Sequence, residues 1–262
     1  MKPASIGMVR DRHRWRATMR MSLLAALLMV AVPAFTAASP PDLSGFWMPL
    51  PGIPDPDPVL ASKVSPDAVV LRDTGPAEFG LMEFGGLKLK PAALEKARQW
   101  DPRQELTVSS TCRIPSIAYA LQGPFPIEIF QGSELIVMRM EYFDMTRVFF
   151  LDDHFMYEHE APHTKTGYSR AHWDGEQLVV ITTRLKESTI TNNGLDHSEQ
   201  IRITERYRLS DDGRTLMVAQ EYEDPEVLEN RGVRYIGWRK VEADHVRAYD
   251  CDPSFAEEYA AP

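Results

Sequence analysis

Residues 199–222 read EQIRITERYRLSDDGRTLMVAQEY, the pattern of two β-strands joined by a tight turn. From Ile201 to Leu209 apolar and polar side chains alternate, as in a strand that turns one face to a core. Asp211-Asp212-Gly213 supplies residues that favour a hairpin turn. This stretch therefore predicts an antiparallel hairpin with one buried face.

Similar segments lie on both sides of this hairpin. Val, Ile, Thr and aromatic residues are enriched in the segments 127–131, 134–143, 145–151, 177–185, 199–209, 214–222, 232–241 and 244–251. Short turns join them, among them Asp174-Gly175 and Glu242-Ala243-Asp244. Eight or so sequential strands indicate a mainly β fold, a single antiparallel barrel or strongly curved sheet. The clearest helix signal covers residues 91–100, so a parallel α/β sheet is not expected.

The first 38 residues have the order of a secretory signal peptide: a basic head, a short apolar run and small residues. The head contains Lys2, Arg10, Arg12, Arg14, Arg16 and Arg20. The apolar run, residues 21–35, is shorter than the roughly 20 residues needed to span a bilayer. We expect cleavage near Ala38 and a periplasmic or secreted protein, with a retained N-terminal anchor as the alternative.

The composition of the remaining chain is that of an acidic protein. Residues 1–38 hold six of the 29 basic residues and one of the 38 acidic ones, so their removal changes the net charge from −9 to −14. Nucleic acids and anionic membrane surfaces favour basic proteins, so neither is an expected partner. No later window is apolar enough to predict a stable membrane span. We expect a Pro-rich arm with one short strand and a helix (39–110), packed as one domain on a barrel core (111–262).

The chain has two cysteines, Cys112 and Cys251. In an oxidising compartment such a pair in β-rich surroundings predicts one disulfide. The bond would close a loop of 139 residues and would fix the C-terminal segment to the first third of the expected domain. A catalytic thiol is the alternative interpretation.

A short motif follows the expected cleavage site. The residues Asp42-Leu43-Ser44-Gly45-Phe46-Trp47 resemble the Gly-x-Trp opening of lipocalin-like (calycin) barrels. In that superfamily the Trp packs across the barrel floor against a basic residue late in the sheet. The resemblance therefore makes Arg239 or Arg247 the expected partner of Trp47, and an ordinary buried Trp is the alternative.

A longer series of motifs extends from Cys112 to Cys251. It comprises Pro124-Phe-Pro126-Ile-Glu128-Ile-Phe-Gln131, Gly167-Tyr168-Ser169, Trp173-Asp-Gly175-Glu-Gln-Leu178, His197-Ser198-Glu199, Glu205-Arg206-Tyr207-Arg208 and Tyr249-Asp-Cys251. Together these motifs resemble an uncharacterised family of exported bacterial proteins. Ala171-His172 departs from the pattern, because many members have a second Gly there. The resemblance covers more than half of the chain and implies no established activity.

Alternation places one carboxylate on an apolar face. Glu205 lies on the same side of its strand as Ile201, Ile203 and Tyr207. An inward carboxylate must be paired, hydrogen-bonded or protonated, and such groups serve in acid–base catalysis. Glu205 is therefore a candidate catalytic residue, and a structural ion pair with an inward Arg is the alternative.

Other polar residues complete a hypothetical site inside the barrel. His197, in a polar loop at a strand mouth, is a candidate general base, with Tyr168 as a further catalytic group, and a loop His that hydrogen-bonds the backbone is the alternative interpretation. Alternation makes Arg147 an inward cation and Tyr142 a cavity phenol, and it turns either Glu128 or Gln131 inward. The candidate ligand-binding residues are Glu128, Gln131, Tyr142, Arg147, Ser169 and Trp173.

One acidic and His-rich cluster could hold a metal ion. It comprises Asp152, Asp153, His154, Glu158, His159, Glu160 and His163. Its spacing matches no helical or Cys-x-x-Cys metal site, so we expect a solvated loop and no metal. Nucleotide-binding loops of the Gly-x-Gly-x-x-Gly or Walker type are absent from the sequence, and no cofactor is expected.

Two functions follow from these expectations. In the first, the barrel cavity is a cofactor-free acid–base site of lyase, isomerase or hydratase type, acting on a small apolar or aromatic compound. In the second, the barrel is a carrier or sensor whose polar groups orient a small hydrophobic ligand. A carboxylate, an imidazole and a phenol around one small volume would favour the enzyme. A mostly apolar pocket with one polar end would favour the carrier.

Overall fold

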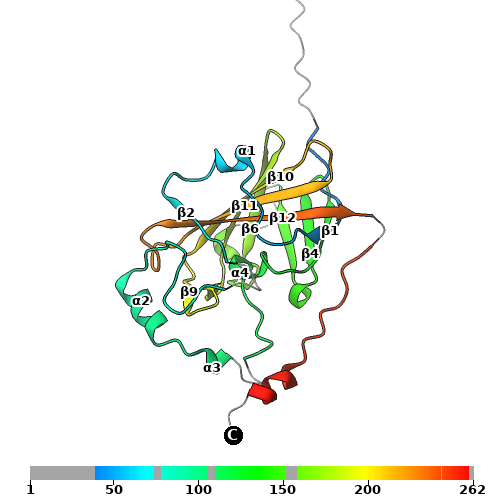
Figure 1. Ribbon diagram of the computed structural model, residues 1–262. Helices are drawn as coiled ribbons and strands as arrows, with labels where there is room; N and C mark the ends of the chain where they lie inside the picture. The colour runs from blue at the N-terminus through cyan, green and yellow to red at the C-terminus, as the bar shows by residue number, and fades with distance from the viewer. Residues whose placement is uncertain (1–38, 74–77, 106–109, 152–157, 243, 260–262) are drawn as a thin grey trace, which may run out of the picture. The chain divides into compact units, whose positions relative to one another are not determined.

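The chain forms a closed β-barrel in the computed structural model, which describes residues 39–73, 78–105, 110–151, 158–242 and 244–259 (Figure 1). The barrel strands are β1 (Gly45–Pro49), β3 (Ile127–Gln131), β4 (Leu135–Met140), β5 (Thr146–Phe150), β6 (Tyr168–Asp174), β7 (Gln177–Thr183), β10 (Arg202–Leu209), β11 (Thr215–Glu223) and β12 (Arg231–Val241). They neighbour one another in this order, and β12 pairs with β1 to close the ring. All neighbours are antiparallel except β5 and β6, which are parallel. The prediction of a mainly β barrel is confirmed. The expected signal peptide, residues 1–38, lies outside the described residues.

Shorter elements surround the barrel. They are β2 (Ala68–Val70), the hairpin β8 (Ser188–Thr191) and β9 (Leu195–His197), the helices α1 (Pro58–Ala61), α2 (Pro91–Arg98), α3 (Pro102–Glu105) and α4 (Ile117–Ala120), and the 3-10 helices Tyr142–Asp144, Glu158–Glu160 and Pro253–Tyr259. β2 pairs in parallel with the start of β12, whereas β1 pairs with its end. β1 and β2 both belong to the Pro-rich arm, so the arm contributes directly to the barrel wall beside β12.

The barrel interior follows the alternation read from the sequence. Ile203, Glu205 and Tyr207 of β10 are each 1% exposed or less, and the residues between them are partly exposed. Large aromatic side chains such as Trp47 and Trp238 are completely buried in the same core. The expected inward orientation of Glu205 is confirmed, because burying the apolar face fixes the strand register.

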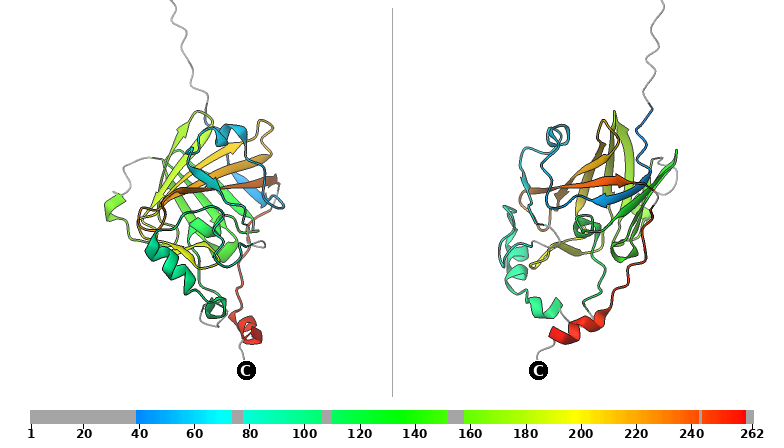
Figure 2. Two further views of the ribbon diagram at one scale, coloured as in Figure 1. Left: turned by 60° about the vertical axis from the view of Figure 1, so that its left-hand side comes forward. Right: turned by 45° about the vertical axis from the view of Figure 1, so that its right-hand side comes forward.

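The segment 244–251, expected as a strand, is not one. The turn expected at residues 242–244 contains Ala243, which lies outside the described residues. Beyond it the chain runs as an irregular C-terminal arm, residues 244–252, away from β12 toward the last 3-10 helix (Figure 2). β12 already pairs with β11 and β1 on its two sides, so no barrel edge is open to a further strand.

The cation beside Trp47 also differs from expectation. Lys240 places Nζ 5.2 Å from the centroid of the Trp47 ring, in the position expected for Arg239 or Arg247. The antiparallel register explains this, because it sets Trp47 directly opposite Lys240 and leaves Met48 opposite Arg239. The Trp47 indole donates its N–H to the carbonyl of Leu43 at 3.0 Å.

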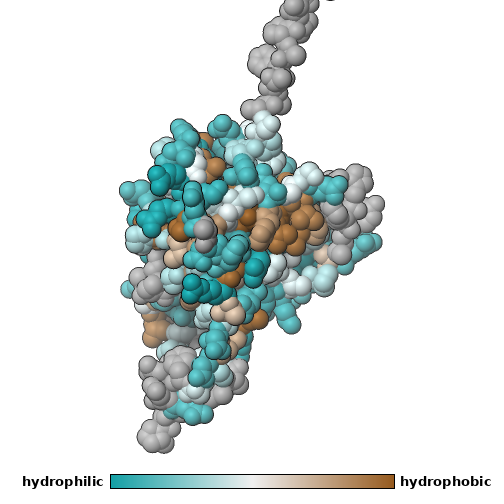
Figure 3. Space-filling model, turned by 90° about the vertical axis from the view of Figure 1, so that its right-hand side faces the viewer, coloured by the Kyte–Doolittle hydropathy of each residue, from teal (hydrophilic) through white to brown (hydrophobic). Residues whose placement is uncertain are grey.

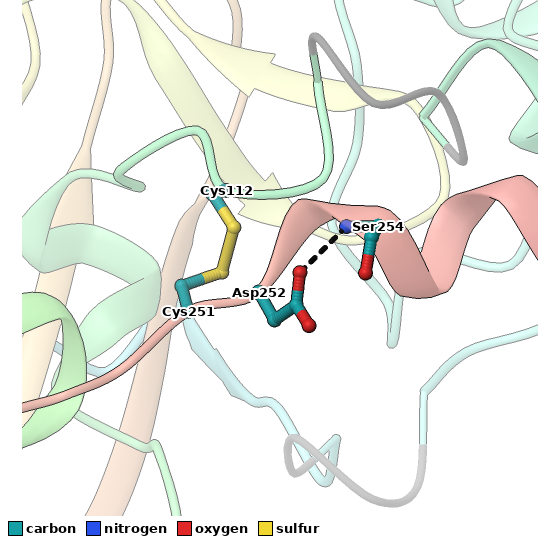
Figure 4. The surroundings of a disulfide bond; sticks show 4 residues. All are labelled: Cys112, Cys251, Asp252 and Ser254. Carbon is teal, nitrogen blue, oxygen red and sulfur yellow. Dashed lines mark hydrogen bonds between the residues drawn. A yellow bond between two sulfur atoms is a disulfide. The ribbon is translucent and has the colours of Figure 1, made fainter.

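The predicted disulfide between Cys112 and Cys251 is confirmed (Figure 4). Its two Cα atoms lie 6.0 Å apart, within the usual range for this bond. The bond joins the C-terminal arm to the segment that leads into α4. Beyond it, Asp252 accepts the backbone N–H of Ser254 at 2.9 Å and so begins the last 3-10 helix.

Candidate functional site

Glu205 forms a buried ion pair with Arg147. The Arg147 guanidinium donates Nη1 to Glu205 Oε1 at 3.1 Å and Nη2 to Glu205 Oε2 at 2.6 Å. Both side chains are 0% exposed. Nη2 also donates to Thr182, which shares a hydrogen bond with Ser169. The inward Arg147 is confirmed, and Glu205 occupies the structural pairing that the sequence left as an alternative to catalysis.

The polar chain continues across the barrel to a second ion pair. Gln220 donates Nε2 to Glu205 Oε1 at 2.9 Å and accepts the Tyr222 hydroxyl at 2.5 Å. Tyr222 in turn accepts Nη1 of Arg234 at 2.8 Å. Arg234 also holds Asp73 through two hydrogen bonds of 2.9 and 2.6 Å. We call these eight residues the interior network: Asp73, Arg147, Ser169, Thr182, Glu205, Gln220, Tyr222 and Arg234.

The interior network lies among side chains that fill the barrel. All eight members are buried, and Phe149 stacks under the Arg147 guanidinium, whose Cζ atom is 4.8 Å from the ring centroid. Buried ions that satisfy one another in this way are stable only while both partners remain. The geometry is that of a polar core, with Glu205 and Arg147 both shielded from solvent.

His197 is also buried, in the small β8–β9 sheet, and does not lie in an open loop. Its Nδ1 lies 2.8 Å from the Ser198 carbonyl and its Nε2 lies 2.7 Å from the Ser116 hydroxyl. Since a carbonyl only accepts, Nδ1 carries the proton and Ser116 donates to Nε2. Burial lowers the pKa of His197, so the imidazole is neutral at neutral pH. The side chain is 1% exposed, and its direct partners belong to neither the Glu205 pair nor Tyr168.

The lowered pKa of His197 gives a pH-dependent stability. Unfolding exposes an imidazole of ordinary pKa near 6.5, which binds a proton more readily than the folded one. The unfolded state therefore gains protons first as the pH falls, and we expect the free energy of unfolding to decrease below about pH 6.5. Urea denaturation at pH 7.5, 6.5 and 5.5 measures this. His197→Gln should remove that part of the dependence, and equal slopes for both proteins would refute the prediction.

The other predicted residues occupy separate places. Tyr168 stacks on Phe150, with ring centroids 5.2 Å apart, and Trp173 packs at the edge of the main core. Glu128 is buried on the outer side of β3. Its Oε2 lies 3.4 Å from Arg139 Nη1 and its Oε1 lies 2.5 Å from His245 Nδ1. These side chains are not brought together around one volume with Glu205.

Gln131 and Tyr142 have roles outside the barrel interior. Gln131 holds the start of the Pro-rich arm. Its side chain accepts the Leu43 N–H and donates to the Pro41 carbonyl, both at 2.9 Å. Tyr142 was expected on a strand, but β4 ends at Met140 and Tyr142 begins a 3-10 turn. There it stacks on Phe125 at 4.9 Å, and burial raises the pKa of Tyr142 to about 12.

The acidic and His-rich segment is described only in part, since residues 152–157 lie outside the described residues. His163 lies 3.1 Å from the Leu185 carbonyl and 3.3 Å from Glu199. Within the described ranges, no group of three or more His, Cys, Asp or Glu residues is placed to hold a metal ion.

A pocket of about 400 Å³ lies where the Pro-rich arm crosses β12. We call it the arm pocket; its lining comprises residues 49–54, 122–124 and 234–237 with Leu71 and Asp73. Leu50 anchors the arm by donating its N–H to the Gly237 carbonyl at 2.9 Å. A Cβ at position 237 would lie 2.8 Å from Leu50 Cδ1, so the missing side chain of Gly237 permits this approach.

The arm pocket is apolar except at one end. Leu50, Ile53 and Ile236 are among its apolar walls, and Asp73, Arg234 and Gln122 form the polar end. The Gln122 amide donates Nε2 to Asp73 Oδ2 at 3.4 Å, and its Oε1 is buried with no partner among the described residues. The volume and the lining are those of a small-molecule site.

A second hollow, of about 650 Å³, lies next to the disulfide. We call it the disulfide cleft; Tyr119, Tyr142, Asn192 and parts of residues 110–115 and 249–252 line it. Behind it the Tyr119 hydroxyl donates to Glu78, and desolvation raises the pKa of Glu78. The lining is more polar than that of the arm pocket, and it is shared by the C-terminal arm.

Sequence reasoning missed the polar end of the arm pocket. Arg234 could have been found, since it alternates with Ile236 and Trp238 on one face of β12. Asp73 and Gln122 lie in irregular segments where no periodicity indicates an orientation. Asp73 is held by Arg234 of β12, 161 residues further along the chain, and Gln122 contacts Asp73, 49 residues earlier.

The outer wall carries an exposed apolar strip on β3, β4 and β5. Phe130 is 48% exposed and lies opposite Val137, which lies opposite the partly buried Val148. Figure 3 shows apolar surface on the side of the barrel that carries β1 and β4 in Figure 1. This strip is a surface patch, whereas the arm pocket is a concave site of about 400 Å³, so the arm pocket is the better small-molecule candidate.

Comparison with protein-family models and with curated proteins found no match to this chain. Within the described part of the chain, no helix is long and apolar enough to cross a membrane.

Proposed function

We propose that the protein is a non-catalytic carrier or sensor that binds a small, largely apolar compound in the arm pocket. The observation that carries the proposal is an apolar pocket of about 400 Å³ with a single polar end. Small-molecule sites of this size combine apolar walls with a few oriented polar groups. The pocket also lies on the barrel wall, where β12 and the anchored arm give it a rigid frame.

The positions of the expected catalytic residues favour binding over acid–base catalysis. Glu205 is fully buried against Arg147, and His197 is buried against Ser116. A general acid or base must come within hydrogen-bond reach of the substrate, directly or through one water. An acid–base activity at Glu205 would require the barrel interior to open, whereas the arm pocket is already formed.

Export to the periplasm or the cell exterior is part of this proposal. Residues 1–38 have the order of a signal peptide, and the Cys112–Cys251 bond suits an oxidising compartment. The resemblance to exported bacterial proteins agrees with this location. Intact-mass measurement of the protein from its native host would test it, because cleavage near Ala38 removes a defined mass.

Binding can be measured with N-phenyl-1-naphthylamine, a neutral probe whose fluorescence rises in apolar surroundings. We expect saturable binding to the wild type, and Ile53→Asp should weaken it by about tenfold or more. The substituted carboxylate would lie in the apolar wall, where an unpaired charge is costly to bury. Mass spectrometry of compounds retained after gentle purification would then identify natural ligands.

Val59→Asp is the matched control. Val59 is 42% exposed on α1, in the same arm and outside the pocket lining. The same charge there should leave probe affinity unchanged. Absence of saturable binding to the wild type, or equal effects of the two substitutions, would contradict the proposal.

A further inference from the structure

We infer that the ligand of the arm pocket is a neutral apolar compound that carries a hydrogen-bond donor, such as an alcohol, phenol or amide N–H. This inference rests on the proposed function and specifies its ligand class. It follows from which polar atoms at the end of the pocket are already used and which are not.

Arg234 has no hydrogen bond left to offer a ligand. A guanidinium has five N–H donors. Nε and Nη2 donate to Asp73, and Nη2 also donates to the Ile190 carbonyl at 2.7 Å. Nη1 donates to the Ala118 carbonyl at 3.0 Å and to the Tyr222 hydroxyl at 2.8 Å. The cation at the end of the pocket is therefore saturated by the protein, and it offers no bidentate site for an incoming carboxylate or phosphate.

The charge of Arg234 is also matched at close range. Asp73 is 3% exposed and forms the ion pair with Arg234 at 2.6 Å. A second anion in the pocket would meet the Asp73 carboxylate and would gain no N–H donor in return. Burying an anion without such partners is strongly unfavourable, so the pocket selects against anionic ligands.

Gln122 supplies the unused acceptor. Its Nε2 faces the Asp73 carboxylate, because a carboxylate can only accept from the amide N–H. Oε1 must then point the other way, where it is buried without a partner among the described residues. Gln122 is a lining residue of the arm pocket, and its long 3.4 Å bond and soft terminal torsion let the amide turn toward a ligand.

A ligand donor would satisfy this oxygen. An unpartnered buried acceptor costs free energy, which a ligand O–H or N–H recovers on binding. A ligand of the same shape without a donor leaves Gln122 Oε1 unpaired and should bind more weakly. The combination of apolar walls, a saturated cation and one free acceptor thus defines the ligand class.

The test compares 2-naphthol, 2-methoxynaphthalene and 2-naphthoate as competitors of N-phenyl-1-naphthylamine. These compounds share one ring system and differ in offering a donor, no donor or an anion. For the wild type we expect 2-naphthol to bind about 5- to 10-fold more tightly than the methyl ether, which is the usual effect of one hydrogen bond. We expect 2-naphthoate to be the weakest of the three.

Gln122→Met keeps the length of the side chain and removes the acceptor. The affinity ratio of 2-naphthol to 2-methoxynaphthalene should fall to about 1, with the ether still binding. Equal affinities in the wild type, a ratio that persists in Gln122→Met, or preferred binding of 2-naphthoate would each overturn the inference. Failure of the probe and of all three compounds to bind the wild type would instead overturn the proposed function. The wild-type comparison decides the inference even if the variant does not fold.

Discussion

Glu205→Gln should lower the free energy of unfolding by about 3–5 kcal/mol. The substitution preserves the volume but removes the charge that compensates Arg147, which is 0% exposed. It also replaces one accepting oxygen by an amide N–H that faces the guanidinium donors. Urea denaturation of the two proteins at pH 7.5 measures the difference.

Glu128→Gln is the matched control for this experiment. Glu128 is also buried, but its partners Arg139 and His245 have side chains that are 48% and 81% exposed. Water can solvate these partners when the carboxylate charge is lost, so we expect a loss below about 1 kcal/mol. Equal effects at the two positions would contradict the structural role assigned to the Glu205 pair. If Glu205→Gln left the stability unchanged but strongly reduced the rate at which the protein converts a substrate, the acid–base hypothesis for Glu205 would be favoured.

Reduction of the Cys112–Cys251 bond should lower the free energy of unfolding by up to about 5 kcal/mol. The bond closes a loop of 139 residues, and its loss gives the unfolded chain much greater conformational freedom. The C-terminal arm should also become more mobile, because its other contacts are few. The backbone N–H groups of Arg247 and Tyr249 donate to the carboxylates of Glu141 and Asp144 at 3.0 and 3.1 Å, His245 contacts Glu128, and Tyr249 packs against Phe143. Urea denaturation with and without dithiothreitol measures the loss.

The double variant Cys112→Ser, Cys251→Ser provides the control. It should have the stability of the reduced wild type and should not respond to dithiothreitol. Mass measurement of alkylated protein must confirm that the wild-type thiols are free after reduction. An unchanged denaturation midpoint in the fully reduced wild type would show that the bond does not stabilise the fold.

The orientation of barrel residues was accessible from the sequence because alternation is a local property. Two neighbouring residues of a strand point to opposite faces, so a run such as Ile203-Thr204-Glu205 identifies its buried face without knowledge of any partner. The same argument placed Arg147 inside correctly. It could not separate catalysis from ion pairing for Glu205, because Arg147 lies 58 residues earlier in the chain.

Residues in turns and loops were harder to place. Tyr142 was expected inside the barrel, but Phe143 and Asp144 adopt φ angles of 54° and 50°, which turn the chain away from the strand. Lys240 was not recognised as the neighbour of Trp47, since the register between the first and last strands follows from closure of the ring. The segment 244–251 has strand-like composition, yet closure of the ring left it no edge to join.

The sequence by itself determined a mainly β chain, the buried faces of its strands and the pairing of its two cysteines. These features follow from side-chain periodicity, turn residues and the number of possible partners. Only the tertiary structure decided that Glu205 meets Arg147, that Asp73 meets Arg234, and that a pocket forms between the arm and β12. The physical reason is that these contacts join segments far apart in the chain, whose approach is fixed by barrel closure and packing and by no local pattern.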